Sequence, residues 1–235
     1  MKKLPVEYVE TKRNYLLFKN DCGVTSAARE GWIYEQFLFD YCKQHLDLSG
    51  RTVIDIGANF GYHSLEFADM VAHGHVHSFE PQRLVYYQLC GNVFANGYAN
   101  VTAHNIALGE KSSQLKMENI DYWSQDTINV GNSHLNAYTQ GGYNWVDVRT
   151  LDSYNFTDVA MIKIDVQGYE PQVLDGAIMT IQQNRPTIFI EIEAPQLSIY
   201  GWQPNDVFSR LDRLGYRYWK LHDADHLVDY VAVAA

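Results

Sequence analysis

The sequence predicts one α/β domain with a Rossmann-like, doubly wound sheet of seven mostly parallel strands and a C-terminal antiparallel hairpin. A length of 235 residues suits a single large domain of this class. From residue 52 onward, β-branched segments alternate with amphipathic ones, which is typical of parallel strands joined by right-handed helical crossovers. The last two strand-like segments flank a short polar turn, HDADH, which indicates the hairpin.

The elements follow one another in that alternating order. Residues 1–46 are expected to form a helical lead-in, with the helix itself over 29–46. We expect strands over 52–56, 76–79, 101–107, 160–166, 187–192, 216–221 and 227–233. Helices are expected over 62–71, 83–94, 171–182 and 206–214. Together these elements make one domain that spans residues 1–235.

One stretch breaks the alternation. Residues 112–145 are rich in Asn, Gln, Ser and Gly and show no clear period. Loops of this length in compact domains are usually functional or disordered, and disordered segments contain few aromatic residues. Because this stretch holds aromatic residues such as Tyr122, Trp123 and Trp145, we expect an insertion that forms a lid or wall on the substrate side.

Composition and charge limit the partners. The formal net charge of −10 disfavours nucleic acids and anionic membrane surfaces. The densest basic group, made of Lys2, Lys3, Lys12 and Arg13, is expected to be a solvated terminal segment. Three irregularly spaced cysteines form no disulfide or zinc pattern, and no signal peptide or membrane span is apparent. We therefore expect a cytoplasmic protein without nucleic-acid or membrane partners, of unspecified oligomeric state.

The first strand leads into the loop VIDIGANFGYHS, with the spacing D-x-G-x-N-x-G. Gly57 and Gly61 permit positive φ and close approach of a ligand. Asp55 stands where a pyrophosphate site would have no carboxylate, so the loop favours a cationic ligand over a dinucleotide. S-adenosylmethionine, with its sulfonium and ammonium groups, fits that requirement. Asp55 and Asn59 would either contact this ligand or hold the loop and cap the next helix.

The second and third loops extend the same site. Glu80 closes the second strand in HSFEPQ, where an acidic side chain can accept both ribose hydroxyls of an adenosine, and Pro81 stiffens the turn. Asn105 and Ala107, in HNIALGE, fall where an adenine ring would lie. The first and second loops, at the ends of successive strands, together predict an adenosine site.

Acidic side chains also end the fourth and fifth strands. Asp165 follows MIKI, and Glu191 lies in TIFIEIE. Carboxylates this close repel each other unless one is protonated, hydrogen-bonded or bridged by a cation. Asp165 and Glu191 are therefore candidates for a catalytic base or for ligands of Mg²⁺ or Mn²⁺, and Asp165 lies beside the expected methyl donor. His63, in the first helical turn, is a third candidate base.

These motifs resemble those of the FkbM-type methyltransferases. The segments that carry the resemblance are VIDIGANFGYHSL, HSFEPQ, NIALGE, RTLDSY, MIKIDVQGYEPQVLDGA and RPTIFIEIE. The match begins near Glu35, which we include among the expected cofactor-binding residues, and ends near Ile192. The resemblance implies a class I methyltransferase fold and O-methylation of a sugar, glycan or related small molecule. In that family an acid usually occupies the position of Gln167, so a carboxylate role there is in doubt.

Two other functions fit parts of the sequence. A nicotinamide-dependent oxidoreductase would share the fold, although Asp55 and the missing third glycine weigh against it. A non-catalytic adenosine-binding module would use residues 112–145 as a partner surface. A nucleic-acid methyltransferase is disfavoured by the charge and by the absence of an N/D-P-P-Y/F tetrapeptide.

Overall fold

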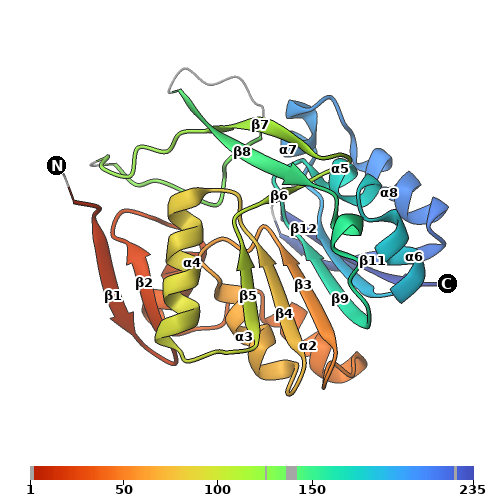
Figure 1. Ribbon diagram of the computed structural model, residues 1–235, viewed down its shortest axis with the longest axis horizontal. Coiled ribbons are helices and arrows are strands. Elements are labelled where there is room, and N and C mark those ends of the chain that lie inside the picture. Colours follow the sequence, from red (N-terminus) through yellow and green to blue (C-terminus); the bar gives the residue numbers. More distant parts are fainter. Residues whose placement is uncertain (1–2, 125, 136–141, 225–226) are drawn as a thin grey trace.

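A seven-stranded sheet forms the centre of the molecule. The computed structural model describes residues 3–124, 126–135, 142–224 and 227–235. Within them the strand order is β11-β12-β10-β9-β3-β4-β5 (Figure 1). The strands from β5 to β10 run parallel, whereas β12 is antiparallel to both β10 and β11. The predicted doubly wound sheet with a C-terminal hairpin is therefore confirmed.

The central strands are buried on both faces, as expected for parallel strands that consist mainly of apolar residues. The strands of the sheet are β3 Thr52–Ile56, β4 His75–Phe79, β5 Val101–His104, β9 Val159–Ile164, β10 Thr187–Glu191, β11 Tyr216–Ala224 and β12 Leu227–Ala234. Side chains alternate between the faces. Ile54 and Ile56 enter one apolar cluster, and Val53 enters the other.

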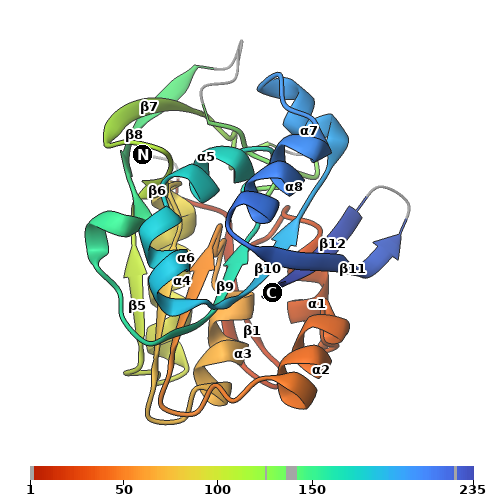
Figure 2. The same ribbon diagram turned by 90° about the vertical axis from the view of Figure 1, so that its right-hand side faces the viewer.

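Helices cover both faces (Figure 2). They are α1 Val24–Glu30, α2 Gln36–His45, α3 Tyr62–Met70, α4 Arg83–Ala95, α5 Glu170–Asp175, α6 Ile178–Asn184, α7 Ala194–Ile199 and α8 Pro204–Arg213, with a 3₁₀ turn at Leu151–Tyr154. Helices α2 and α3 pack on the face of Val53, and α5, α6 and α8 pack on the face of Ile54. No described helix is long and apolar enough to cross a membrane.

The start of the chain is a hairpin and not the predicted helical lead-in. Strands β1 (Val6–Glu10) and β2 (Asn14–Phe18) pair antiparallel, apart from the main sheet. Exposed and part-buried residues alternate along β1, the period of a strand. The predicted helix over 29–46 is also shorter, because Gly31 ends α1 in the left-handed conformation and α2 starts only at Gln36.

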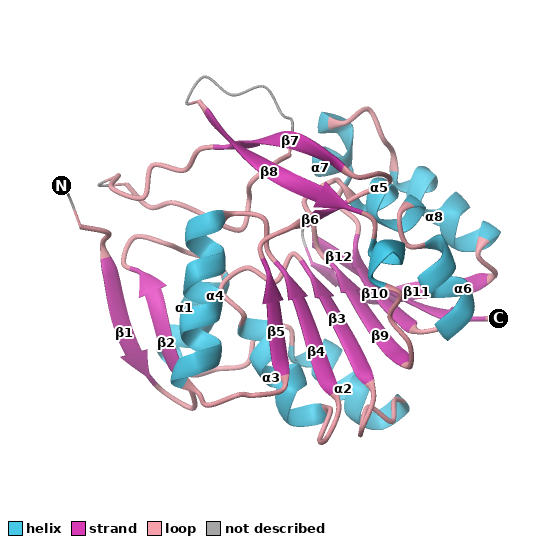
Figure 3. Cartoon of the chain, in the orientation of Figure 1, coloured by secondary structure: helices cyan, strands magenta, loops and turns pink. Residues whose placement is uncertain are grey.

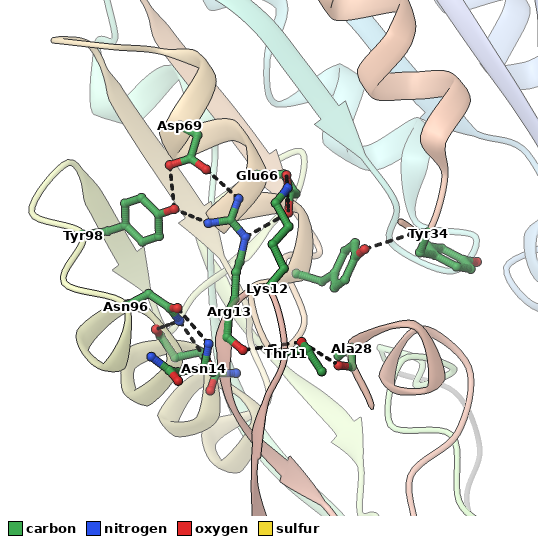
Figure 4. A network of polar contacts seen from close by, with 12 residues as sticks. Thr11, Lys12, Arg13, Asn14, Ala28, Tyr34, Glu66, Asp69, Asn96 and Tyr98 are labelled. Carbon is green, nitrogen blue, oxygen red and sulfur yellow. Dashed lines mark hydrogen bonds and ion pairs between the residues drawn. The ribbon is translucent and has the colours of Figure 1, made fainter. Parts of the chain in front are cut away.

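Arg13 in the hairpin turn anchors this hairpin to the domain (Figure 4). Its guanidinium lies 2.8 Å from a carboxylate oxygen of Glu66 and 2.7 Å from one of Asp69, and it donates to the hydroxyl of Tyr98. Arg13 is only 6% exposed, so the prediction of a solvated basic segment is wrong at this residue. Lys2 lies outside the described residues.

The insertion is more regular than its sequence indicates. Strands β6 (Ala107–Leu108), β7 (Ser113–Glu118) and β8 (Tyr143–Arg149) form a second sheet with β8 in the centre. Figure 3 shows β7 and β8 lying above the carboxyl ends of the parallel strands. Residues 112–145 thus include β7 near one end and the first residues of β8 at the other.

Close backbone packing explains another difference. The helix predicted over 171–182 is divided into α5 and α6 at Gly176. A Cβ atom at Gly176 would lie 2.0 Å from the carbonyl oxygen of Gly109, so the chain leaves no room for a side chain here. The third strand likewise ends at His104, short of the predicted Ala107. Helix α7 was not predicted.

Candidate active site

A cavity of about 410 Å³ lies at the carboxyl ends of the parallel strands. This is the place where open α/β sheets bind ligands. The predicted site residues that line it are Gly57, Asn59, Glu80, Pro81, Ala107, Asp165 and Glu191. The other predicted site residues, which do not line it, are Glu35, Asp55, Gly61, His63 and Asn105.

Glu80 is the best-fixed carboxylate of this cavity. One oxygen accepts the backbone N–H of Gln82 at 2.8 Å, and the other accepts that of Asn59 at 3.0 Å. Burial raises the pKa of Glu80 to about 7, against the lowering effect of these two hydrogen bonds. The side chain therefore joins the first two loops and keeps its orientation without a ligand.

The third loop contributes an apolar wall. Ile106, Ala107 and Leu108 line the cavity. Asn105 instead donates from its amide nitrogen to the carbonyl oxygens of Glu80 and Pro81, each at 2.9 Å. The prediction that Asn105 contacts the cofactor is therefore replaced by a supporting role: its side chain holds the second loop.

The two glycines of the first loop serve packing. Gly57 has φ 83°, and a Cβ atom there would lie 1.8 Å from the carbonyl oxygen of Asp165. Gly61 precedes α3 with φ 92°, and a Cβ atom there would lie 2.5 Å from the side chain of Leu89. Gly57 thus lets the first and fourth loops touch. Gly61 was predicted to be a cofactor-binding residue, but it faces the protein interior.

Asp55 also faces the interior. It shares a strand face with Val53, the face covered by α3, and it is completely buried. Ser64 of α3 donates to Asp55 Oδ2 at 2.6 Å, and Ser78 of β4 donates to the Ser64 hydroxyl at 2.8 Å. Of the two roles predicted for Asp55, holding the loop is the one that its hydrogen bond to Ser64 supports, and its side chain does not line the cavity.

The acidic pair at the ends of β9 and β10 faces the cavity as predicted. Lys163 Nζ lies 3.0 Å from Asp165 Oδ2. The amide nitrogen of Gln167 donates to Asp165 Oδ1 and to Glu191 Oε2, each at 3.1 Å. Burial opposes ionisation of Asp165, but the charge of Lys163 and the hydrogen bonds from Glu191, Lys163 and Gln167 together outweigh it and lower the pKa of Asp165 to about 2.

The second member of the pair holds its proton. Burial, together with the negative charge of Asp165, raises the pKa of Glu191 well above its usual range. Near neutral pH the pair therefore consists of an ionised Asp165 and a protonated Glu191, as expected for two neighbouring carboxyl groups that cannot both carry charge.

His63 is paired elsewhere. Its Nε2 lies 3.0 Å from Glu35 Oε2, and both side chains are 9% exposed. Burial raises the pKa of Glu35, but the charges of His63 and Lys163 outweigh it, so the net shift is downward. Neither His63, predicted as a base, nor Glu35, predicted to contact the cofactor, lines the cavity: the two side chains lie against each other between the start of α2 and the first turn of α3. The neighbouring residue Tyr34 lines the cavity instead.

One wall of the cavity combines two distant segments. Residues 129–133 belong to the insertion that was expected to form a wall, whereas residues 21–25 were not predicted to contribute. Asp21 Oδ1 accepts the backbone N–H groups of Cys22 and Val130, each at 3.0 Å, and Ile128 exchanges backbone hydrogen bonds with Asn20 and Cys22. No local sequence pattern predicts a pairing of residues more than 100 positions apart in the chain.

The cavity lining is acidic. It includes the carboxyl groups of Asp21, Glu80, Asp165, Glu191 and Glu193. Among its described residues there is no Lys or Arg. A low-dielectric pocket with this lining favours a cationic ligand and repels phosphate.

The predicted metal site does not fit the donor set. Among the described residues, no three His, Cys, Asp or Glu side chains come together to hold a metal ion. The amide nitrogen of Gln167 lies between Asp165 and Glu191, and it is a hydrogen-bond donor, not a metal ligand.

Known proteins show the same fold. Residues 55–218 match the family model of the methyltransferase FkbM domain. The crystal structure of a methyltransferase FkbM from Methylobacillus flagellatus KT is similar, with a TM-score of 0.53 and 20% identity over 79% of this chain and 44% of that chain. A precorrin-6y C5,15-methyltransferase from Geobacter metallireducens GS-15 has a TM-score of 0.52 and 12% identity over 86% and 87% of the two chains. A putative rRNA-methylase from Clostridium thermocellum has a TM-score of 0.52 and 13% identity over 83% and 93%. No curated protein matches the chain.

The solved structures establish the class I methyltransferase fold. This chain spans less than half the length of the Methylobacillus protein. The family model covers most of the chain, from Asp55 at the first strand to Tyr218 in the C-terminal hairpin. This match sets aside the nicotinamide-dependent oxidoreductase. The chain belongs to the FkbM family of methyltransferases, which depend on S-adenosylmethionine.

Proposed function

We propose that this protein transfers a methyl group from S-adenosylmethionine to a hydroxyl oxygen of a sugar, glycan or related small molecule. The observation that carries the proposal is the carboxyl pair of Asp165 and Glu191, both contacted by the amide of Gln167, in a cavity whose described lining has no Lys or Arg. A hydroxyl is a weak nucleophile and needs a group that takes its proton during methyl transfer.

The residues of the cavity suit this cofactor. The fixed carboxylate of Glu80 can accept the two ribose hydroxyls, and the wall at Ile106–Leu108 is apolar enough for an adenine. The acidic lining favours the positive charges of the donor. When bound, S-adenosylmethionine supplies an electrophilic methyl group on a sulfonium.

Asp165 acts as the proton acceptor in this proposal. The carbon–sulfur bond breaks as the carbon–oxygen bond forms, the hydroxyl proton passes to Asp165, and S-adenosylhomocysteine leaves. A carboxylate with a pKa near 2 suffices, because the acidity of the acceptor oxygen rises steeply as it gains the methyl group. Lys163 and Gln167 keep Asp165 in place, which holds the reacting groups in line.

The polar groups around the pair suit an acceptor with several hydroxyls. Asn132 and Gln196 line the cavity and are linked by a hydrogen bond of 3.1 Å, and Gln196 also contacts His134 at 2.6 Å. Amide and carboxyl groups that face a cavity can bind neighbouring hydroxyls in pairs. The similar protein from Clostridium thermocellum is described as a putative rRNA-methylase. In this chain, an RNA acceptor would bring phosphates into the acidic cavity, which disfavours RNA.

The test is a methyl-transfer assay with labelled S-adenosylmethionine and three acceptor classes: neutral mono- and oligosaccharides, amines, and RNA. We expect label in the saccharides, at an oxygen identified by NMR as a methoxy group, and loss of transfer in Asp165→Asn. Transfer to RNA or amines alone would contradict the proposal. Binding of the cofactor without transfer to any acceptor class would instead favour the non-catalytic adenosine-binding module.

A further inference from the structure

Gln167 and Lys163 surround the acidic pair with hydrogen-bond donors. Gln167 Nε2 is 3.1 Å from an oxygen of each carboxyl group, and Lys163 Nζ is 3.0 Å from the remaining oxygen of Asp165. Because both contacts of Gln167 go to carboxyl oxygens, its nitrogen and not its oxygen faces the pair. The two donor groups thus contact the carboxyl oxygens that a bridging cation would bind.

The backbone fixes the position of this amide. Gln167 adopts φ 53° and Gly168 adopts φ 94°. A side chain other than glycine in the left-handed region is strained, and such strain is found preferentially at functional sites. Glu170 Oε1 accepts the N–H groups of Val166 and Gly168 at 3.3 Å and 3.0 Å, which ties the loop into one shape. The amide is therefore presented to the pair by a constrained turn.

Charge is also balanced without a metal ion. Lys163 is 4% exposed and carries the positive charge that compensates the ionised Asp165. A divalent cation prefers several oxygen ligands and a net negative site. Here the ammonium group of Lys163 already contacts Asp165, so such a cation gains little.

We propose that Gln167 is a positioning residue that makes this acidic pair independent of metal, because its amide provides the bridge that a divalent cation would otherwise provide. The role in catalysis rests on the proposed O-methyl transfer. The bridging itself depends only on the residues of the pair, so it can be tested without an acceptor.

The direct test is Mn²⁺ binding, measured by electron paramagnetic resonance on the purified full chain. The wild type should bind no Mn²⁺ at this site up to millimolar concentration. Gln167→Glu replaces the amide donor with a third carboxyl group and should gain one Mn²⁺, which the additional change Glu191→Gln should remove. The control Gln114→Glu adds the same charge beside Asp147 on the exposed β7–β8 ladder and should bind none.

Stoichiometric Mn²⁺ on the wild type that Asp165→Asn abolishes would overturn the proposal, and so would a Gln167→Glu variant that stays folded but gains no Mn²⁺. Where an acceptor is known, activity adds a second readout. Gln167→Met should leave the Kd of S-adenosylhomocysteine unchanged and lower kcat by about 10- to 100-fold. The acidic limb of its pH–rate profile should move to higher pH, since the Gln167 hydrogen bond favours the ionised Asp165. An unchanged profile and an unchanged kcat would count against Gln167, whereas failure of all acceptors affects only the proposed function.

Discussion

Replacing Glu80 with Gln should weaken cofactor binding strongly. The carboxylate accepts one backbone N–H on each oxygen and, in our account, both ribose hydroxyls as well. The amide keeps one acceptor oxygen and places an NH₂ group against either Asn59 N–H or Gln82 N–H. One charged ribose contact is lost and the other loses its charge.

The expected magnitude follows from these contacts. A hydrogen bond to a charged group contributes about 1.5–3 kcal/mol, and the remaining neutral contact contributes about 1 kcal/mol. We therefore expect a loss of about 2–5 kcal/mol in binding free energy, or about 30- to 5000-fold in Kd. The assay is isothermal titration with S-adenosylhomocysteine at pH 8, where Glu80, with its pKa of about 7, is mostly ionised.

A matched control separates binding from folding. Asp152 likewise accepts two backbone N–H groups, those of Met179 and Thr180, but it does not line the cavity. Asp152→Asn should lower the thermal stability and leave Kd unchanged. If Glu80→Gln bound the ligand within threefold of the wild type, the assignment of Glu80 to the ribose would be refuted.

Three further results are expected. Arg13→Met should lower the free energy of unfolding in urea by about 3 kcal/mol, because it removes a buried guanidinium that pairs with Glu66 and Asp69. Lys12→Met should change it by less than about 1 kcal/mol, since the Lys12 side chain is 56% exposed, and equal losses would contradict this difference. Gly57→Ala should abolish cofactor binding in titrations and lower Tm, because the added Cβ atom meets the carbonyl oxygen of Asp165. A variant that binds normally would show that the first and fourth loops can separate. Affinity for S-adenosylhomocysteine should fall as the pH decreases below about 7, by up to about tenfold per pH unit, because Glu80 must lose its proton to accept both ribose hydroxyls. The affinity of Glu80→Gln should show no such pH dependence.

Much of the fold follows from local patterns in the sequence. The strands at residues 52–56 and 187–192 are apolar runs bounded by turn residues, and the structure places them within one residue of prediction. The hairpin at Val6–Phe18 was missed because its strands are only five residues long and β1 exposes the apolar residues Val6 and Tyr8, so the sequence shows no apolar face there. Gly176 divides a helix for a reason visible only in three dimensions, its contact with Gly109.

The candidate site shows a similar division. Glu80 and Asp165 were predicted because acidic residues at the ends of parallel strands meet at one edge of the sheet, and both line the cavity. Asp55 and His63 belong to the first loop motif as well. Their side chains, however, point to the helix layer, where they meet Ser64 and Glu35. A motif gives the position of a residue along the chain, but the partners that decide its direction come from other elements.

The central claim is that the cavity at the strand ends binds an adenosyl methyl donor. Isothermal titration of the purified chain with S-adenosylmethionine, S-adenosylhomocysteine and NAD⁺ tests it most directly. We predict one site per chain for each of the two sulfur compounds and no heat of binding for NAD⁺. A protein that is folded by circular dichroism but has no measurable affinity for either sulfur compound would contradict the account.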